Sequence, residues 1–388
     1  MYDYEAYKID LFKEMVEYIG KNRFNVFLGK MIGKKNGLII PDADVYKYSY
    51  IIKQLEKIGI MIQYIFVYTD CPIKNIGQCR VVQLKELASL EIIPEYVLYV
   101  HTETYISAEL VEYLWQYNIR DIRIISSEVS DMMYQNFLYH IIDFYQIYSW
   151  LSDDISRKVF INDIKGDYTG SYSEYIFANE PQYLLNGFAP VANDIVIDGG
   201  AFDGNTSLRF HLMGAKVYSF ELDAKNFIKC KQVADKMGFV AENLGLGKEK
   251  EVIKYNNLEG ASHIDEMGNE FGKIIDIDSY VIENDLSHVD FIKLDIEGAE
   301  LDALKGARNT IAIFKPKMAI CTYHKTEDIW ELAQYIKSIR PDYEFAWRHY
   351  PGEVTSRSPE TLKLLNLRSE FGLNNFMKTE WEKVLYCR

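Results

Sequence analysis

Short apolar runs alternate with helical patterns along the chain, in two separate series. Such alternation is typical of βαβ units, which build parallel sheets covered by helices. In the first series the predicted strands are GLII (37–40), IMIQYIFVY (60–68), YVLYV (96–100) and DIRIIS (121–126), and VVQLKELASL (81–90) is a predicted helix. The pattern predicts an α/β fold, and a length of 388 residues predicts more than one domain.

The second series predicts seven strands in one α/β domain over residues 186–388. They are IVIDGG (195–200), KVYSFEL (216–222), FVAENLGLG (239–247), DFIKLDI (290–296), KMAICTY (317–323), YEFAWRHY (343–350) and EKVLYC (382–387). The last two have no helical pattern between them, which predicts an antiparallel hairpin with residues 351–381 as an insertion. We expect a Rossmann-like accessory domain over 1–126 and a helical connector or lid over 127–185.

Composition excludes several classes of protein. A net charge of −14 argues against a protein that mainly grips nucleic acid. No run of about 18 apolar residues exists, so no membrane span is expected, and the stretch 133–151 is predicted to be an amphipathic helix. Five cysteines with no CxxC pair, together with an acidic start that lacks a secretory signal, favour a cytoplasmic protein.

The first domain lacks a phosphate-binding turn. A doubly wound sheet usually binds nucleotide at its first strand–helix turn through glycines, but here the turn reads PDADVYKYSY (41–50). We therefore expect this domain to serve in substrate recognition or in homo-oligomer formation rather than in nucleotide binding.

A glycine-rich turn follows the first strand of the second series, in IVIDGGAFDGNT (195–206). Against the dinucleotide fingerprint G-x-G-x-x-G, Ala201 stands where the middle glycine belongs. A better template is acidic-x-Gly-x-x-x-Gly, met by Asp198, Gly200 and Gly204. Backbone N–H groups of such a turn can meet a carboxylate, while Asp198 can hold an ammonium group. S-adenosylmethionine carries both groups, whereas NAD carries a pyrophosphate and no ammonium.

Glu221 ends the next predicted strand, in KVYSFELD. A carboxylate at this position can accept hydrogen bonds from ribose hydroxyls, although a strand-terminal surface acid is the alternative. Helix capping explains Asp203 and Asn205 at least as well as ligand contact does.

The fourth predicted strand ends in Asp295, Glu297 and Glu300 around Gly298. Ligands of open α/β sheets bind beyond the carboxyl ends of the strands, so Asp295 and Glu297 are expected to face the crevice. Acids in a first helical turn also complement the helix dipole, which explains Glu300 well and Asp295 poorly.

DFIKLDIEGAELDALKGA (290–307), together with IVIDGGAFDGNT, TYHKTEDIWELAQYI and YEFAWRHY, resembles the FkbM-type family of S-adenosylmethionine-dependent methyltransferases. The resemblance covers about residues 180–350 and the last strand. It implies a class I methyltransferase sheet with strand order 3-2-1-4-5-7-6 and methylation of a hydroxyl of a sugar, glycan or sugar-containing metabolite. It also implies a cofactor site, whose expected residues are Asp198, Gly199, Gly200, Ala201, Phe202, Gly204, Thr206, Glu221, Leu222, Asn243 and Asp295.

Methyl transfer to a hydroxyl is helped by a base within hydrogen-bond reach, and the candidates are Asp295 and His324. A histidine that titrates near neutrality suits this role, although His324 can instead brace the helix that starts near residue 327. Glu297, Tyr323, Arg348 and His349 are candidate acceptor-binding residues; for the last two a structural ion pair is the alternative. Asp295 and Glu297 can also supply oxygen ligands for magnesium, but no clustered ligand set supports a metal site.

Two other functions stay open at this stage. A nicotinamide-dependent sugar oxidoreductase or epimerase requires the fingerprint that Ala201 interrupts. A catalytically silent nucleotide-binding module is the other alternative, and the set Asp198, Glu221 and Asp295 argues against it.

Overall fold

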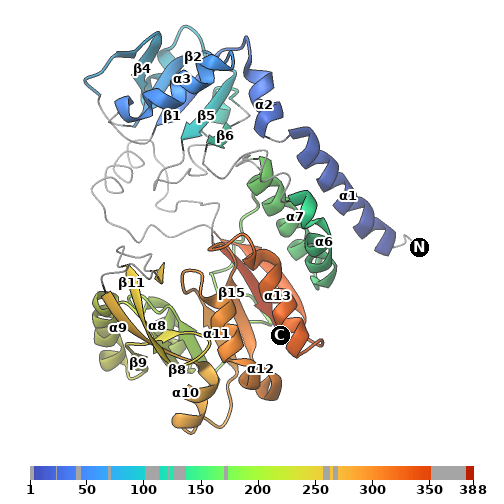
Figure 1. Ribbon diagram of the computed structural model, residues 1–388, viewed down its shortest axis with the longest axis vertical. Coiled ribbons are helices and arrows are strands. Elements are labelled where there is room, and N and C mark those ends of the chain that lie inside the picture. Colours follow the sequence, from blue (N-terminus) through green and yellow to red (C-terminus); the bar gives the residue numbers. More distant parts are fainter. Residues whose placement is uncertain are drawn as a thin grey trace. The chain divides into compact units, whose positions relative to one another are not determined.

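The computed structural model describes residues 4–22, 24–40, 45–68, 71–100, 113–119, 122–125, 137–169, 174–256, 263–264, 270–350 and 382–388. The described residues form two compact units, the first drawn from residues 1–145 and 158–177 and the second from 146–157, 178–350 and 382–388 (Figure 1). The predicted insertion 351–381 and the turn 41–44 lie outside the described residues. The predicted domain boundaries and the lid role of 127–185 stay predictions.

The first unit contains a six-stranded sheet with the order β3-β4-β2-β1-β5-β6. Its strands are β1 (Asn36–Ile40), β2 (Ile62–Val67), β3 (Asn75–Ile76), β4 (Cys79–Gln83), β5 (Tyr96–Val100) and β6 (Ile122–Ile125). All pairs are parallel except β3–β4, which confirms the four predicted strands and the α/β class.

The predicted helix over residues 81–90 is wrong in its first part. Val81 and Val82 belong to β4, and a 3-10 helix, η2 (Leu84–Ser89), follows. The two valines are buried in the hydrophobic clusters on which the sheet packs, and β-branched side chains favour a pleated strand in such a place.

The described helices of the first unit include, besides η2, α1 (Tyr4–Asn22), α2 (Phe24–Met31), η1 (Val45–Tyr48) and α3 (Ser49–Lys57). α6 (Ile141–Trp150) and α7 (Asp154–Thr169) each run across the division between the two units. α6 confirms a helix within the predicted stretch 133–151. Over the described part of the chain, no helix combines the length and apolar character needed to cross a membrane.

The second unit contains a seven-stranded sheet with the order β16-β17-β15-β14-β7-β8-β9. Its strands are β7 (Ile195–Gly199), β8 (Lys216–Phe220), β9 (Val240–Glu242), β14 (Phe291–Leu294), β15 (Lys317–Cys321), β16 (Phe345–His349) and β17 (Lys383–Cys387). Counted along this domain the order is 3-2-1-4-5-7-6, so the predicted class I methyltransferase fold is confirmed. β17 pairs antiparallel with both β15 and β16, which confirms the terminal hairpin.

Two layers of helices accompany this sheet. α8 (Asn205–Leu212) and α9 (Ala224–Met237) pack on each other, as do the members of a second group: α10 (Ile277–Glu283), α11 (Glu300–Gly306), α12 (Arg308–Phe314) and α13 (Asp328–Ile339). Right-handed crossovers that run in opposite directions from β7 place these two groups on opposite faces. α9 shows the local logic, because Asp223 accepts hydrogen bonds from two backbone N–H groups at its start and Gly238 ends it in the left-handed conformation.

A second, four-stranded sheet was not predicted. Its order is β10-β13-β11-β12, from β10 (Gly245–Leu246), β11 (Glu251–Asn256), β12 (His263–Ile264) and β13 (Glu270–Ile275). The predicted strand 239–247 is therefore split: β9 ends at Glu242, and the chain enters the small sheet two residues after Asn243. Val252 and Phe271 on this sheet are exposed.

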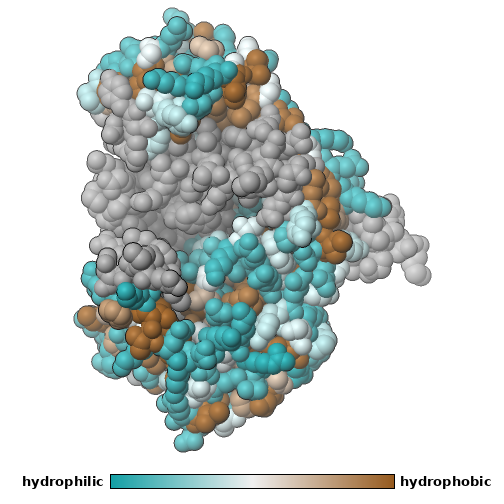
Figure 2. Space-filling model, viewed as in Figure 1, coloured by the Kyte–Doolittle hydropathy of each residue, from teal (hydrophilic) through white to brown (hydrophobic). Residues whose placement is uncertain are grey.

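The described surface seen in Figure 2 is mainly hydrophilic, and its hydrophobic areas lie apart from one another.

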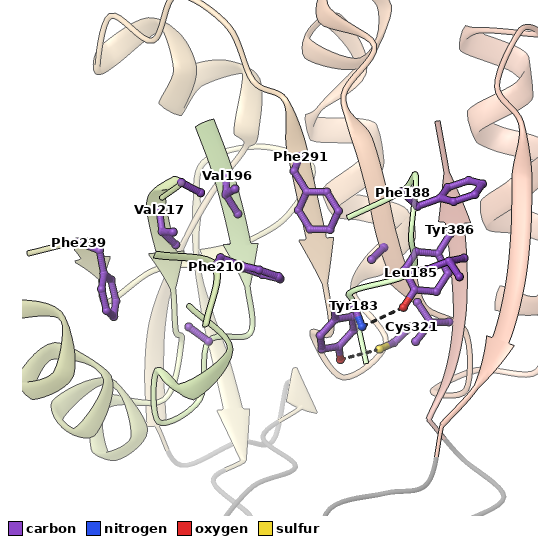
Figure 3. Close-up of a cluster of buried hydrophobic side chains, with 14 of the residues drawn as sticks. Tyr183, Leu185, Phe188, Val196, Phe210, Val217, Phe239, Phe291, Cys321 and Tyr386 are labelled. Carbon is purple, nitrogen blue, oxygen red and sulfur yellow. Dashed lines mark hydrogen bonds between the residues drawn. The ribbon is translucent and has the colours of Figure 1, made fainter. Parts of the chain in front are cut away.

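The core of the second unit lies beside the central strands (Figure 3). Figure 3 also shows the ring of Tyr183 beyond the arrowhead ends of these strands, next to Cys321. The Tyr183 N–H donates to the Tyr386 hydroxyl at 2.9 Å, which holds the segment before β7 against β17. A tyrosine is thereby fixed at the carboxyl edge of the sheet.

Candidate active site

The turn between β7 and α8 depends on two left-handed glycines. Gly200 has φ +73°, and a Cβ there would lie 1.7 Å from the carbonyl oxygen of Asp295. Gly204, at φ +85°, caps α8 where a Cβ would lie 3.2 Å from the Cα of Cys230. The backbone of the turn closely approaches the end of β14 and α9, so a Cβ would overlap Asp295 at Gly200 and would be in tight contact with Cys230 at Gly204. Asp203 accepts hydrogen bonds from the N–H and the side-chain amide of Asn205, at 3.1 and 2.8 Å.

Asp198 is fully buried, and its carboxylate lies 3.1 Å from the Lys293 ammonium. The Ser207 hydroxyl donates to it at 2.5 Å. The same ammonium donates to the carbonyls of Gly199 and Gly200 at 2.8 and 2.7 Å. Asp198 and the carbonyls of the turn therefore surround the ammonium group of Lys293. The sequence analysis expects Asp198 to hold the ammonium group of a ligand instead.

Glu221 lies one residue beyond β8 and is 8% exposed. It accepts the backbone N–H groups of Phe202 and Asp223, each at 2.8 Å. Burial raises its pKa to about 7, against the two N–H groups, which act to lower it. The carboxyl thus ties the glycine turn to the end of β8 and keeps free lone pairs for hydroxyl donors.

The side-chain amide of Asn243 donates to the carbonyls of Glu221 and Leu222 at 2.8 and 3.0 Å. The ends of β8 and β9 are joined in this way. The structure brings these three residues together with the glycine turn, through the bond between Glu221 and Phe202. Thr206 lies in the first turn of α8, half-buried, and Ala201 is buried beneath the turn.

Asp295 follows β14 and accepts two tyrosine hydroxyls. Tyr183 donates to it at 2.9 Å and Tyr323 at 3.0 Å. Burial acts to raise the pKa of Asp295, but the charges of Lys293 and His324 beside it and the Tyr183 hydrogen bond outweigh burial and lower it. Burial raises the pKa of both tyrosines well above the usual value, so the hydroxyls stay protonated as donors.

His324 lies among three carboxylates. Its Nδ1 is 2.9 Å from Glu300, and its Nε2 is 3.5 Å from Glu297 and 3.6 Å from Asp295. Burial acts to lower the pKa of His324, but these acids, led by Glu300, outweigh it and raise the pKa to about 9. The expectation that His324 titrates near neutrality is corrected, because its neighbours keep the imidazole protonated at pH 7.

Glu297 is half-buried, and burial raises its pKa to about 7 against the opposing charge of His324. Its backbone is left-handed, at φ +55°. Among the described non-glycine residues with positive φ are Tyr183, Phe202, Glu297 and Glu382. These four lie around the same strand ends, and conformations that are sparsely populated gather at functional sites.

Glu382 is a site residue that sequence reasoning missed. It precedes β17, which runs antiparallel to its neighbours, so the residue lies at the carboxyl edge of the parallel strands. Gln182 donates to its carboxylate at 2.6 Å and to the Tyr183 hydroxyl at 3.1 Å. Burial and the charge of Asp295 raise the pKa of Glu382 to about 7. The predicted hairpin contained this signal, since it brings the start of the last strand to that edge.

The two residues predicted near the end of β16 are buried. Arg348 forms a 2.9 Å ion pair with Glu180 and donates to the Ser156 hydroxyl at 2.7 Å. These contacts correspond to the structural ion-pair alternative, and His349 is fully buried in β16. No group of three or more His, Cys, Asp or Glu side chains that could hold a metal ion is found in the part of the chain that the structure describes.

Comparison with known proteins agrees with this geometry. Residues 198–346 match the family described as the Methyltransferase FkbM domain, a range that begins at Asp198 and includes Glu221, Asp295 and His324. No curated protein sequence matches the chain.

Among solved structures, the methyltransferase FkbM of Methylobacillus flagellatus KT is similar with a TM-score of 0.60 and 18% sequence identity. The match covers 96% of this chain and 92% of that one, and at this identity it supports the fold. A precorrin-6y C5,15-methyltransferase from Geobacter metallireducens GS-15 matches with a TM-score of 0.31 and 8% identity, over 56% of this chain and 93% of that one; this score is too low to carry an argument. The strand order 3-2-1-4-5-7-6 and the match over residues 198–346 lead to one conclusion: this part of the chain has a class I methyltransferase fold and is similar to the Methyltransferase FkbM domain.

Proposed function

We propose that the protein is an S-adenosylmethionine-dependent O-methyltransferase that acts on a hydroxyl of a sugar, glycan or sugar-containing metabolite. The observation that carries this proposal is the joining of the glycine turn to Glu221 by the Phe202 hydrogen bond, with Asp295 at the adjacent strand end. One edge of the sheet thereby presents backbone N–H groups, a ribose-type acceptor and a polar reaction end. When bound, the cofactor supplies a methyl group attached to a sulfonium.

Different residues at the carboxyl edge of the sheet would bind different parts of such a cofactor. The N-terminus of α8 after Gly204 carries the positive end of the helix dipole and would favour the carboxylate of the cofactor. The carboxyl of Glu221 serves the ribose hydroxyls, and Asn243 with Leu222 borders the adenine side. We assign Asp198 a positioning role, because its charge is directed to Lys293 within the core.

At the reaction end, His324 and its neighbouring carboxyls divide the work. A protonated His324 donates a hydrogen bond to the acceptor oxygen rather than removing its proton. The proton of the acceptor hydroxyl then passes to Asp295 or Glu297, whose carboxylates lie beside the imidazole. Since the pKa of Glu297 is raised to about 7 and that of Asp295 is lowered, Glu297 is the stronger base of the two.

Methyl transfer tests this proposal directly. The full chain is incubated with S-adenosylmethionine carrying a tritiated methyl group and with simple glycosides as acceptors, and labelled product is counted. Labelling of a hydroxyl supports the proposal; label on nitrogen only would contradict it. His324→Ala should lower turnover at least tenfold and leave S-adenosylhomocysteine affinity nearly unchanged, because the histidine lies at the acceptor end.

For the first unit we propose a role in acceptor recognition or in self-association. It holds a polar cavity of about 400 Å³ beside the ends of β2 and β4, with Lys74, Arg80 and Glu86 among its lining residues. Light scattering of the full chain tests self-association; a monomer across micromolar concentrations would leave recognition as the proposed role.

A further inference from the structure

Negative charge exceeds positive charge at the reaction end of the site. Lys293 and His324 are the cations that contact the acids there. Their neighbours include the carboxyls of Asp198, Asp295, Glu297, Glu300 and Glu382. Lys293 lies 3.1 Å from Asp198, and His324 lies closest to Glu300, at 2.9 Å.

Asp295 and Glu297 share the charge of His324 with Glu300, at 3.6 and 3.5 Å, so the carboxyls outnumber the cations that contact them. Nearby Lys325 directs its ammonium to the carbonyl of Gly298, and the buried carboxyl of Asp328 adds further negative potential. The imbalance lies at the strand ends where the methyl group is transferred.

The carboxyls are held in place by the fold. Glu382 is linked to Asp295 through Gln182 and Tyr183 by hydrogen bonds of 2.6, 3.1 and 2.9 Å. Glu297 and Glu382 both have left-handed backbones at φ +55°. Among the described residues, neither ring nitrogen of the buried His324 has a hydrogen-bond partner of good geometry, although Nδ1 lies 2.9 Å from Glu300; Nε2 faces Asp295 and Glu297. A buried polar atom in such a place marks a ligand-facing end of the cluster.

Resting on the proposed function, we propose that Asp295, Glu297 and Glu382 select the cationic sulfonium cofactor over its neutral thioether product. Methyl transfer breaks the methyl–sulfur bond and leaves the electron pair on sulfur, so the positive charge that these carboxyls attract disappears. Attraction between opposite charges at low effective dielectric is lost at that moment. The site thereby binds the substrate form more tightly and releases the product.

Selection of this kind depends on pH. Burial raises the pKa of Glu297 and Glu382 to about 7, and the groups that face them are Asp295, Glu300, Glu221, His324 and Gln182. Both carboxyls are mostly protonated at pH 6 and mostly ionised at pH 8. A bound cation favours ionisation, so affinity for the sulfonium should rise with pH, whereas affinity for the thioether should not.

Calorimetric titration of the full chain with S-adenosylmethionine and with S-adenosylhomocysteine, at pH 6 and pH 8, tests the inference without an acceptor. We expect the ratio of the affinity for S-adenosylmethionine to that for S-adenosylhomocysteine to rise about tenfold from pH 6 to pH 8. This factor corresponds to a bound cation that lowers the pKa of a carboxyl by about one unit. Sinefungin, which carries a protonated amine in place of the sulfonium, should behave like S-adenosylmethionine.

Glu382→Gln and Glu297→Gln should each reduce the pH-dependent rise and leave S-adenosylhomocysteine affinity within twofold. Glu283→Gln, which removes an exposed partner of Lys250, is the matched control and should keep the full rise. Circular dichroism melting verifies that each variant folds. Equal affinities for both compounds at pH 8, or an undiminished rise in both site variants, would overturn this inference alone. If neither compound binds, the proposed function would be overturned as well.

Discussion

At the scale of single residues, Gly200 occupies a position where the surrounding backbone leaves no room for a side chain. Its φ is left-handed, and the carbonyl oxygen of Asp295 would lie 1.7 Å from a Cβ at this position. Gly238 at the end of α9 has a similar φ, +93°, but nothing within 4 Å of a Cβ. The two glycines therefore separate a steric effect from a conformational one.

We expect Gly200→Ala to lower the free energy of unfolding by about 3 kcal/mol or more, or to displace the turn and abolish cofactor binding. Gly238→Ala should lower it by about 1 kcal/mol, the conformational cost of a left-handed alanine. Urea denaturation with fluorescence detection measures both. Similar losses for the two variants would show that the approach to β14 is unimportant.

The protonated state of His324 makes a second residue-scale prediction. Its folded pKa of about 9 lies above the ordinary value of 6.5, so its stabilising contribution is complete below pH 6.5 and disappears as pH rises through 9. For this buried side chain the contribution is about 3 kcal/mol.

The stability of the wild type relative to His324→Gln should therefore fall between pH 6 and pH 10. Chemical denaturation at both pH values measures the difference. A difference that is constant with pH would mean that the imidazole is neutral in the folded protein.

Some residue roles could be predicted from the sequence and others could not. A strand-terminal acid such as Glu221 can be recognised from its position, because the carboxyl edge of a parallel sheet is where ligands bind. The sequence also indicates a buried ion pair at Lys293, because a lysine inside the apolar run FIKLDI has to be paired when the strand is buried. That pairing takes up the charge of Asp198, and sequence spacing does not reveal which group an acid faces.

At the scale of elements, the Asp198–Lys293 pair joins β7 to β14 at the point where both strands end. The two residues are opposite each other in the parallel register. Both side chains are almost completely buried, so removal of one leaves the other as an unpaired charge.

Lys293→Met should lower the free energy of unfolding by about 3 kcal/mol, and Asp198→Asn by a similar amount. The double variant should be less destabilised than the sum, because neither member of the pair is left facing an empty place. A double-mutant cycle measured by chemical denaturation tests this. Strict additivity would argue that the two groups do not interact.

The strands of the main sheet could be predicted because most of their apolar runs are nearly continuous, and β7, β14, β16 and β17 are buried at every position. The four-stranded sheet could not, since EVIKYN and EFGKII mix charged and apolar residues and two of its strands contain two residues each. Such strands are stabilised by pairing across the chain rather than by local pattern. The same limit explains the misassigned helix at 81–90.

At the scale of the whole molecule, the matched methyltransferase domain occupies residues 198–346, and the candidate site extends beyond it at both ends. Tyr183 comes from the segment before β7 and Glu382 from the start of the last strand, and both connect to Asp295. Pairing of β17 between β15 and β16 is what brings residues 199 positions apart into one network. The predicted hairpin indicates the place of Glu382, whereas its link to Asp295 through Gln182 and Tyr183 is seen only in the folded structure.

The central claim, that the edge formed by the glycine turn, Glu221 and Asp295 binds S-adenosylmethionine, is tested most directly by isothermal titration of the full chain. S-adenosylhomocysteine and NAD are titrated separately at pH 8. We expect saturable one-site binding of S-adenosylhomocysteine in the micromolar range, weakened about tenfold or more by Glu221→Ala through the lost ribose hydrogen bonds, and no binding of NAD. Binding of NAD without binding of S-adenosylhomocysteine would contradict the account.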